Sequence, residues 1–139
     1  MSLYVLDTDT LQLLQDEHPE VVRRVRAVPL TDRAISVVTV EEQLSGWYTE
    51  LRQAKRPERL AWAYRRLAAT VRFLSKLQII DLDERAIQRC AELRRQKIRV
   101  RSMDLRIAAT VLECGATLVT RNTRDFRQVP GPHIEDWSK

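Results

Sequence analysis

Histidine and cysteine, which build many catalytic and metal sites, are scarce in this sequence of 139 residues, which has two of each. Both histidines, at positions 18 and 133, neighbour a proline. The sequence therefore offers few residues from which a Ser-His-Asp triad or a histidine-rich zinc site could be built. Cys90 and Cys114 lie far apart on apolar helical stretches and form no CxxC pair, which favours buried free thiols in a reducing compartment.

Long apolar runs are also missing, and none approaches the ~20 residues that a membrane-spanning helix needs. The N-terminal segment resembles a strand rather than a charged and then apolar targeting segment. No repeat, low-complexity tract or flexible linker interrupts the chain. We therefore expect one domain over residues 1–139, in a soluble, cytoplasmic protein without membrane contact.

Basic residues exceed acidic ones, with 24 Lys and Arg against 19 Asp and Glu and a net charge of +5. Such a surface suits a polyanionic substrate held by basic walls. Arginine-rich helix faces in contact with solvent explain the same excess equally well, so composition leaves both interpretations open.

Predicted strands alternate with predicted helices along the chain. Short apolar runs predict strands at 3–6, 34–38, 77–82, 117–120 and 133–137. Two long amphipathic helices, opening at Thr39 and at Pro57, are neighbours in sequence. Another helix covers 83–96, and a further one has Ser102 as its N-cap and Gly115 after its last turn. This alternation predicts an α/β fold with a mostly parallel sheet.

Carboxylates recur where the predicted strands end or the following helices begin. In an open parallel sheet, ligand sites form beyond the carboxyl ends of the strands, so we expect these side chains to converge. The residues in such positions are Asp7, Asp9, Glu42, Asp104 and Asp125.

Taken singly, each of these carboxylates has a local structural explanation. Glu42 follows Thr39 by three residues, which is the spacing of a capping box. Asp104 suits the positive end of its helix dipole, and either aspartate after the first strand could cap the next helix. Asp125 fits a turn. None of these explanations predicts that all five meet at one edge of a sheet.

A cluster of carboxylates needs protons or a cation, because at ~5 Å an ionised pair repels by ~3 kcal/mol at an effective dielectric of ~20. Since the set contains neither histidine nor cysteine, its oxygen ligands favour Mg²⁺, or Mn²⁺, over zinc. Such an ion makes a water nucleophilic and neutralises the charge that grows on a phosphodiester. The sequence therefore favours a metal-dependent nuclease.

The same segments resemble the PIN-domain nucleases, and among them the VapC-like toxins of type II toxin–antitoxin modules. The resemblance covers nearly the whole chain, in the four acidic motifs Tyr4–Thr10, Ser36–Gly46, Ser102–Ala109 and Leu118–Phe126. The register of the second motif selects Glu42 over Glu41. The chain departs from the family at Gln43, where an apolar residue is more usual, and at Asp9, where Asn or Ser is common.

The resemblance implies a PIN-like three-layer α/β/α fold with a central sheet of four to five strands. It also implies a metal-dependent endoribonuclease that leaves a 5′-phosphate and a 3′-hydroxyl, forms homodimers and is inhibited by a cognate VapB-like antitoxin. The acidic set carried over is Asp7, Glu42, Asp104 and Asp125, with Asp7, Asp104 and Asp125 as the metal ligands. Thr120 and Asn122 become supporting hydrogen-bonding residues, and Asp9 a helper.

Arginines and aromatic residues near these motifs have two interpretations each. Arg101, Arg121 and Arg124 flank the last two motifs and could hold RNA phosphates, and surface solvation explains them equally well. The aromatic side chains of Trp47, Trp62 and Tyr64 could line a groove for an antitoxin segment, although core packing is favoured.

Two other functions compete with the nuclease. Residues 7–11 also fit the DxDxT opening of haloacid-dehalogenase-type phosphatases, with Asp7 as nucleophile and Thr39 as the phosphate-binding hydroxyl. That interpretation leaves Glu42 and Asp104 without roles and finds neither a lysine motif nor room for a cap domain. The third candidate is a PIN-like domain that binds RNA or protein without catalysis.

Overall fold

A five-stranded parallel sheet forms the centre of the computed structural model, which describes residues 2–139. Its order is β3-β2-β1-β4-β5, and every neighbouring pair is parallel. The sheet is therefore wholly parallel, as the alternating pattern predicts, and the strand order reverses beside the central β1. The strands are β1 (Tyr4–Leu6), β2 (Arg33–Ser36), β3 (Gln78–Ile80), β4 (Thr117–Val119) and β5 (His133–Glu135).

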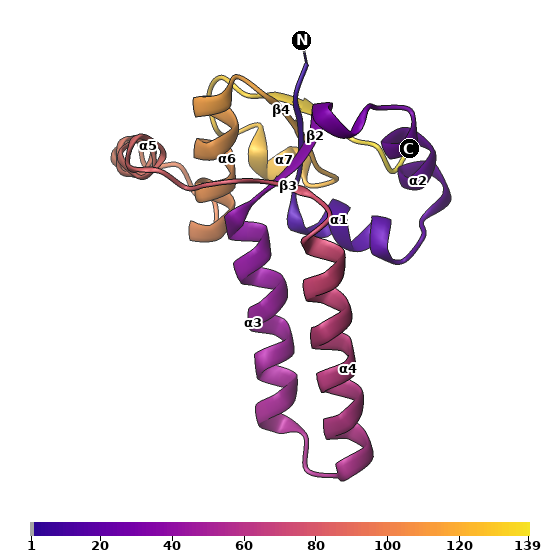
Figure 1. The fold of residues 1–139 in the computed structure, drawn as a ribbon. Coiled ribbons are helices and arrows are strands. Elements are labelled where there is room, and N and C mark those ends of the chain that lie inside the picture. Colours follow the sequence, from indigo (N-terminus) through magenta and orange to yellow (C-terminus); the bar gives the residue numbers. More distant parts are fainter. Residues whose placement is uncertain (1) are drawn as a thin grey trace.

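Helices cover both faces of this sheet (Figure 1). They are α1 (Thr8–Gln15), α2 (Pro19–Arg26), α3 (Val37–Gln53), α4 (Pro57–Leu74), α5 (Glu84–Arg95), α6 (Ser102–Cys114) and α7 (Thr123–Phe126). A short 3₁₀ turn, η1 (Leu30–Asp32), precedes β2.

Alternate strand residues point to opposite faces and fill two separate cores. Val5 and Leu118 pack with residues of α5, α6 and α7, including the fully buried Phe126. Leu6 and Val119 pack instead with α1, α2 and the end of α4. The three-layer α/β/α architecture is thus confirmed.

Helices α3 and α4 form a long hairpin whose far end extends away from the sheet (Figure 1). Trp47 and Trp62 pack edge to face between the two helices, with ring centroids 5.4 Å apart. The guanidinium groups of Arg66 and Arg59 lie over these two rings. The two tryptophans are only half-buried and belong to none of the buried core clusters, and Tyr64 is 57% exposed, so core packing is wrong for Tyr64 and the groove for an antitoxin segment stays a prediction.

Helix α3 begins two residues before the predicted start. The hydroxyl of Ser36, the last residue of β2, accepts a hydrogen bond from the Val38 backbone N–H at 3.0 Å and caps the helix. The capping box predicted for Thr39 and Glu42 is consequently wrong, because both residues already lie inside the helix. Their side chains are free for other contacts.

The ends of α6 show one correction and one confirmation. Arg101 is the N-cap, while Ser102 is the first helical residue and its hydroxyl accepts a hydrogen bond from Arg94. Gly115 ends the helix in the left-handed conformation at φ 62°, as predicted.

Of the two free thiols, Cys90 is buried, but Cys114, in the last helical position, is exposed. Over residues 2–139, no helix combines the length and apolarity needed to cross a membrane.

Candidate active site

Asp7 lies where central strand β1 passes into α1. One carboxylate oxygen accepts the Thr10 backbone N–H at 2.8 Å and caps α1, and the other accepts the Thr120 hydroxyl at 2.6 Å, just beyond β4. The residue is only 5% exposed. This burial raises the pKa of Asp7, against the opposing effect of the hydrogen bonds from Thr120 and Thr10. A nearby cation would favour the charged form that burial disfavours.

Thr8 links the end of β1 to α3. Its hydroxyl donates to Glu42 Oε1 at 2.6 Å and lies 3.0 Å from the buried hydroxyl of Thr39. These contacts hold Glu42, in the second turn of α3, beside the carboxyl end of the central strand. The sequence motifs do not identify Thr8, although a hydroxyl residue directly after Asp7 is a signal that could have done so.

Arg101 contacts two of the predicted carboxylates. Its Nε and Nη2 atoms each lie 3.2 Å from an oxygen of Asp104, and Nη2 is 3.6 Å from Glu42 Oε2. Asp104 is the main cause that raises the pKa of Arg101, and the charges of Glu42 and Asp125 raise it further. The guanidinium is therefore an internal counter-charge to three acidic residues. Most of the Arg101 side chain, 69%, is nevertheless exposed to solvent.

Asp125 is connected to Asp7 through the two predicted supporting residues. The Asn122 side-chain amide donates to Asp125 Oδ2 at 3.0 Å. The Asn122 backbone N–H donates to the Thr120 hydroxyl at 2.9 Å, and that hydroxyl in turn donates to Asp7. Asp125 belongs to the single turn of α7, which is anchored in the core by the buried Phe126.

Asp9 faces away from this group. Its carboxylate pairs with Arg121, whose Nε and Nη2 atoms lie 2.8 and 3.2 Å from the two oxygens. Half of the Asp9 side chain is exposed, and its charge raises the pKa of Arg121. Asp9 thus affects Asp7 only at a distance, as a minor cause of the raised pKa of Asp7. Of the three predicted phosphate-binding arginines, Arg101 and Arg121 are ion-paired, and Arg124 is exposed.

The four predicted carboxylates offer only oxygen ligands, which is the ligand chemistry that a hard divalent cation prefers. Among residues 2–139, however, no three carboxylate, imidazole or thiolate groups stand in the geometry of a formed metal site. Each carboxylate instead bonds to a neighbour of its own. The pairs are Asp7 with Thr120, Glu42 with Thr8, Asp104 with Arg101 and Asp125 with Asn122. Arg101 occupies the position of a counter-cation and would have to move for an ion to reach Asp104.

The geometry disfavours the phosphatase interpretation. Both oxygens of Asp7, the expected nucleophile, are engaged by Thr10 and Thr120 in a buried position. The second carboxylate of the DxDxT pattern, Asp9, pairs with Arg121 at the surface. Thr39, the expected phosphate-binding hydroxyl, is fully buried against Thr8.

Comparisons with known proteins agree with the acidic motifs. The family model "PIN domain" matches residues 4–132. The tRNA(fMet)-specific endonuclease VapC of Salmonella typhimurium is 33% identical over 99% of both chains, and its namesake in Shigella flexneri is 32% identical over 99% of this chain and 100% of that one. The structure of DNA-bound VapBC from Salmonella typhimurium superposes with a TM-score of 0.77 at 31% identity, over 99% of both chains. Because the family model and full-length VapC relatives both match nearly the whole chain, this protein belongs to the PIN-domain family and to its VapC-like members.

Proposed function

We propose that this protein is a metal-dependent endoribonuclease of the toxin–antitoxin type, with Asp7, Glu42, Asp104 and Asp125 as its catalytic carboxylates. The observation that carries the proposal is the network at the carboxyl edge of the sheet. Arg101 contacts Glu42 and Asp104 directly, and a chain of hydrogen bonds runs from Asp7 to Asp125. The VapC relatives, which are named as endonucleases and, in one case, as a ribonuclease, support this proposal.

Asp7, Asp104 and Asp125 would hold Mg²⁺, or Mn²⁺, with Glu42 beside them. A bound divalent cation supplies an activated water and neutralises charge on the phosphodiester. Asp7 is fixed for this role by Thr10 and Thr120, which leave its carboxylate little freedom to rotate. Thr8 binds Oε1 of Glu42, so Oε2 is the oxygen that can orient the attacking water or accept its proton.

RNA is the proposed substrate, and a VapB-like antitoxin the proposed inhibitor, in the cytoplasm. Solved relatives described as VapBC complexes support an antitoxin partner. The α3–α4 hairpin offers a surface that either the antitoxin or the second copy of a homodimer could contact. Its exposed apolar side chains are Tyr48, Leu60, Tyr64 and Val71.

The decisive experiment compares RNA cleavage by the wild type, Asp104→Asn and Asp32→Asn in Mn²⁺ and in EDTA. Asp32 is a matched control, because it lies in η1 before β2, at the opposite end of the strand from the site. We expect 5′-phosphate ends from the wild type and the control in Mn²⁺ only, and no cleavage by Asp104→Asn.

Three results would contradict the proposal in different ways. Cleavage that survives both Asp104→Asn and EDTA would exclude the metal site. An acid-stable phosphoryl adduct at Asp7, with hydrolysis of small phosphomonoesters, would establish the phosphatase. Binding of RNA by the wild type without cleavage in any divalent ion would indicate a non-catalytic domain.

A further inference from the structure

The segment between α5 and α6 alternates partly buried apolar and exposed basic side chains. Ile98 and Val100 pack against the core cluster that contains Leu93 and Leu105. Lys97, Arg99 and Arg101 are exposed between and beside them. Because Ile98 and Val100 contact the core, the basic side chains between and beside them lie at the surface.

This segment leads directly into the candidate active site. At the end of the segment farther from the site in sequence, Arg94 in the last turn of α5 donates a hydrogen bond to the Ser102 hydroxyl at 2.9 Å. At its near end Arg101 contacts Asp104 and Glu42. We call Arg94, Lys97, Arg99 and Arg101 the basic strip.

The two cations in the middle of the basic strip have no structural partner. Within residues 2–139, neither Lys97 nor Arg99 forms an ion pair. Of the arginines of α5, Arg89 pairs with Glu113 and Arg95 with Glu92, whereas Arg94 binds the Ser102 hydroxyl and Arg85 forms no ion pair within the described residues. The charges of Lys97 and Arg99 are therefore available to an anionic partner.

Lys97 has an unusual backbone conformation for a residue with a side chain. Its φ of 59° is left-handed, in the position after a helix end where glycine is the usual residue. A lysine there costs conformational stability relative to glycine, and no contact of its charged group within the chain offsets that cost. Glu17 has the same φ of 59° after α1, so this backbone conformation does not by itself require a ligand.

We propose that the basic strip binds the phosphate backbone of the RNA substrate and delivers it to Asp104. This inference rests on the proposed nuclease function and adds to it the surface along which the strand enters. Lysine and arginine bind phosphates through charge-assisted hydrogen bonds, and arginine does so in bidentate form. A strand lying along Lys97 and Arg99 reaches Arg101, which already touches two catalytic carboxylates.

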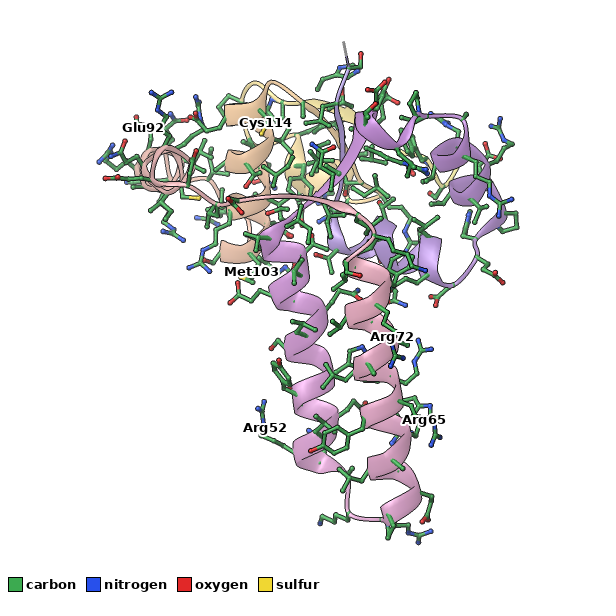
Figure 2. The ribbon with its side chains drawn as sticks, in the orientation of Figure 1. Arg52, Arg65, Arg72, Glu92, Met103 and Cys114 are labelled. Carbon is green, nitrogen blue, oxygen red and sulfur yellow. The ribbon has the colours of Figure 1, made fainter. Side chains whose placement is uncertain are left out.

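The test measures binding of a fluorescently labelled single-stranded RNA over a range of salt concentrations, in EDTA so that the RNA stays intact. The strip variant is Lys97→Gln/Arg99→Gln, in the full chain. The control variant is Arg65→Gln/Arg72→Gln, which removes the same charge from α4, where both side chains point outward from the hairpin (Figure 2). Neither pair belongs to the catalytic carboxylates or to their contacts.

We expect the strip variant to bind about tenfold more weakly than the wild type, and its salt slope to fall by about 1.4, since each single-strand phosphate contact contributes about 0.7. The control should keep the wild-type slope. A second variant, Lys97→Gly/Arg99→Gln, suits the left-handed backbone and should give the same loss with no decrease in melting temperature.

An unchanged salt slope in both strip variants, while the wild type still cleaves RNA, would refute RNA binding by the basic strip without affecting the proposed nuclease function. Equal weakening in the strip and control variants would also refute RNA binding by the basic strip, because net charge alone would explain the binding. A wild type that neither binds nor cleaves RNA would refute the nuclease itself.

Discussion

At the scale of single residues, Asp7 combines two roles that conflict energetically. Its carboxylate caps α1 and accepts from Thr120, yet its burial disfavours the charge. Because the folded pKa lies above the unfolded one, the folded chain binds more protons between the two pKa values. The contribution of Asp7 to stability therefore decreases as the pH rises through that window.

Asp7→Asn should accordingly stabilise the metal-free protein at pH 7. Asparagine still caps the helix and removes the buried charge. We expect a melting temperature higher by a few degrees, at roughly 2–4 °C per kcal/mol, and a difference that decreases as the pH falls and the wild-type carboxyl takes up its proton. Thermal melts from pH 4 to pH 8 in EDTA measure it. A variant that is less stable at every pH would show that the ionised hydrogen bonds outweigh burial.

Arg101 competes with any cation that binds Asp104. Arg101→Gln should therefore bind Mn²⁺ more tightly in the absence of RNA. For so exposed an arginine the ion pair is worth about 1 kcal/mol at most, which corresponds to about fivefold in Kd. Isothermal titration calorimetry measures this, with Arg65→Gln as the control, because Arg65 points outward from α4, away from the site (Figure 2). Equal or weaker affinity in Arg101→Gln would refute the competition.

At the scale of elements, the start of α3 determines where Glu42 points. Ser36 ends β2 in register with Ile80 of β3 and also caps α3. Thr39 and Glu42 are therefore helical, and both face Thr8. The sequence predicted Thr39 as the cap, whereas the strand pairing extends β2 to Ser36 and makes Ser36 the cap.

The α3–α4 hairpin extends beyond the sheet and depends on its own contacts. Trp62→Ala should reduce the free energy of unfolding by about 2 kcal/mol, roughly half the cost for a fully buried tryptophan, since the ring is half-buried against Trp47. Tyr64→Ala, two residues away and exposed, should change it by less than about 0.5 kcal/mol. Urea denaturation of both variants gives the comparison, and equal losses would show that the tryptophan pair does not hold the hairpin.

At the scale of the whole molecule, the four carboxylates come from the β1–α1 junction, α3, α6 and α7, so one site depends on four separate parts of the chain. A cation that binds them in the folded state alone should stabilise the entire domain. At 100 times its Kd, Mn²⁺ would add about 2.7 kcal/mol, or about 5–10 °C in melting temperature. Differential scanning calorimetry should show this shift in the wild type and in Asp32→Asn, and much less in Asp104→Asn. No shift in the wild type at millimolar Mn²⁺ would count against the site.

The sequence alone determined those features that depend on neighbouring residues. Apolar periodicity located the strands and the helices α3 to α6, Gly115 marked the end of α6, and Pro57 the start of α4, whereas Asp125, expected in a turn, lies in helix α7. The parallel sheet followed from their alternation, and with it the expectation that strand-end carboxylates share one edge. Helix propensity, capping and strand pattern act over a few residues, so they can be read locally.

Only the tertiary structure decided which partner each of these carboxylates has. Thr8 meets Thr39 and Glu42 across 31 and 34 residues of sequence, and Thr120 meets Asp7 across 113. Asp9, beside Asp7 in sequence, pairs instead with Arg121, and Arg101 bridges Asp104 and Glu42. Such choices result from competition among charges and hydroxyls that only folding brings within hydrogen-bond distance, where burial and geometry favour one pair over another.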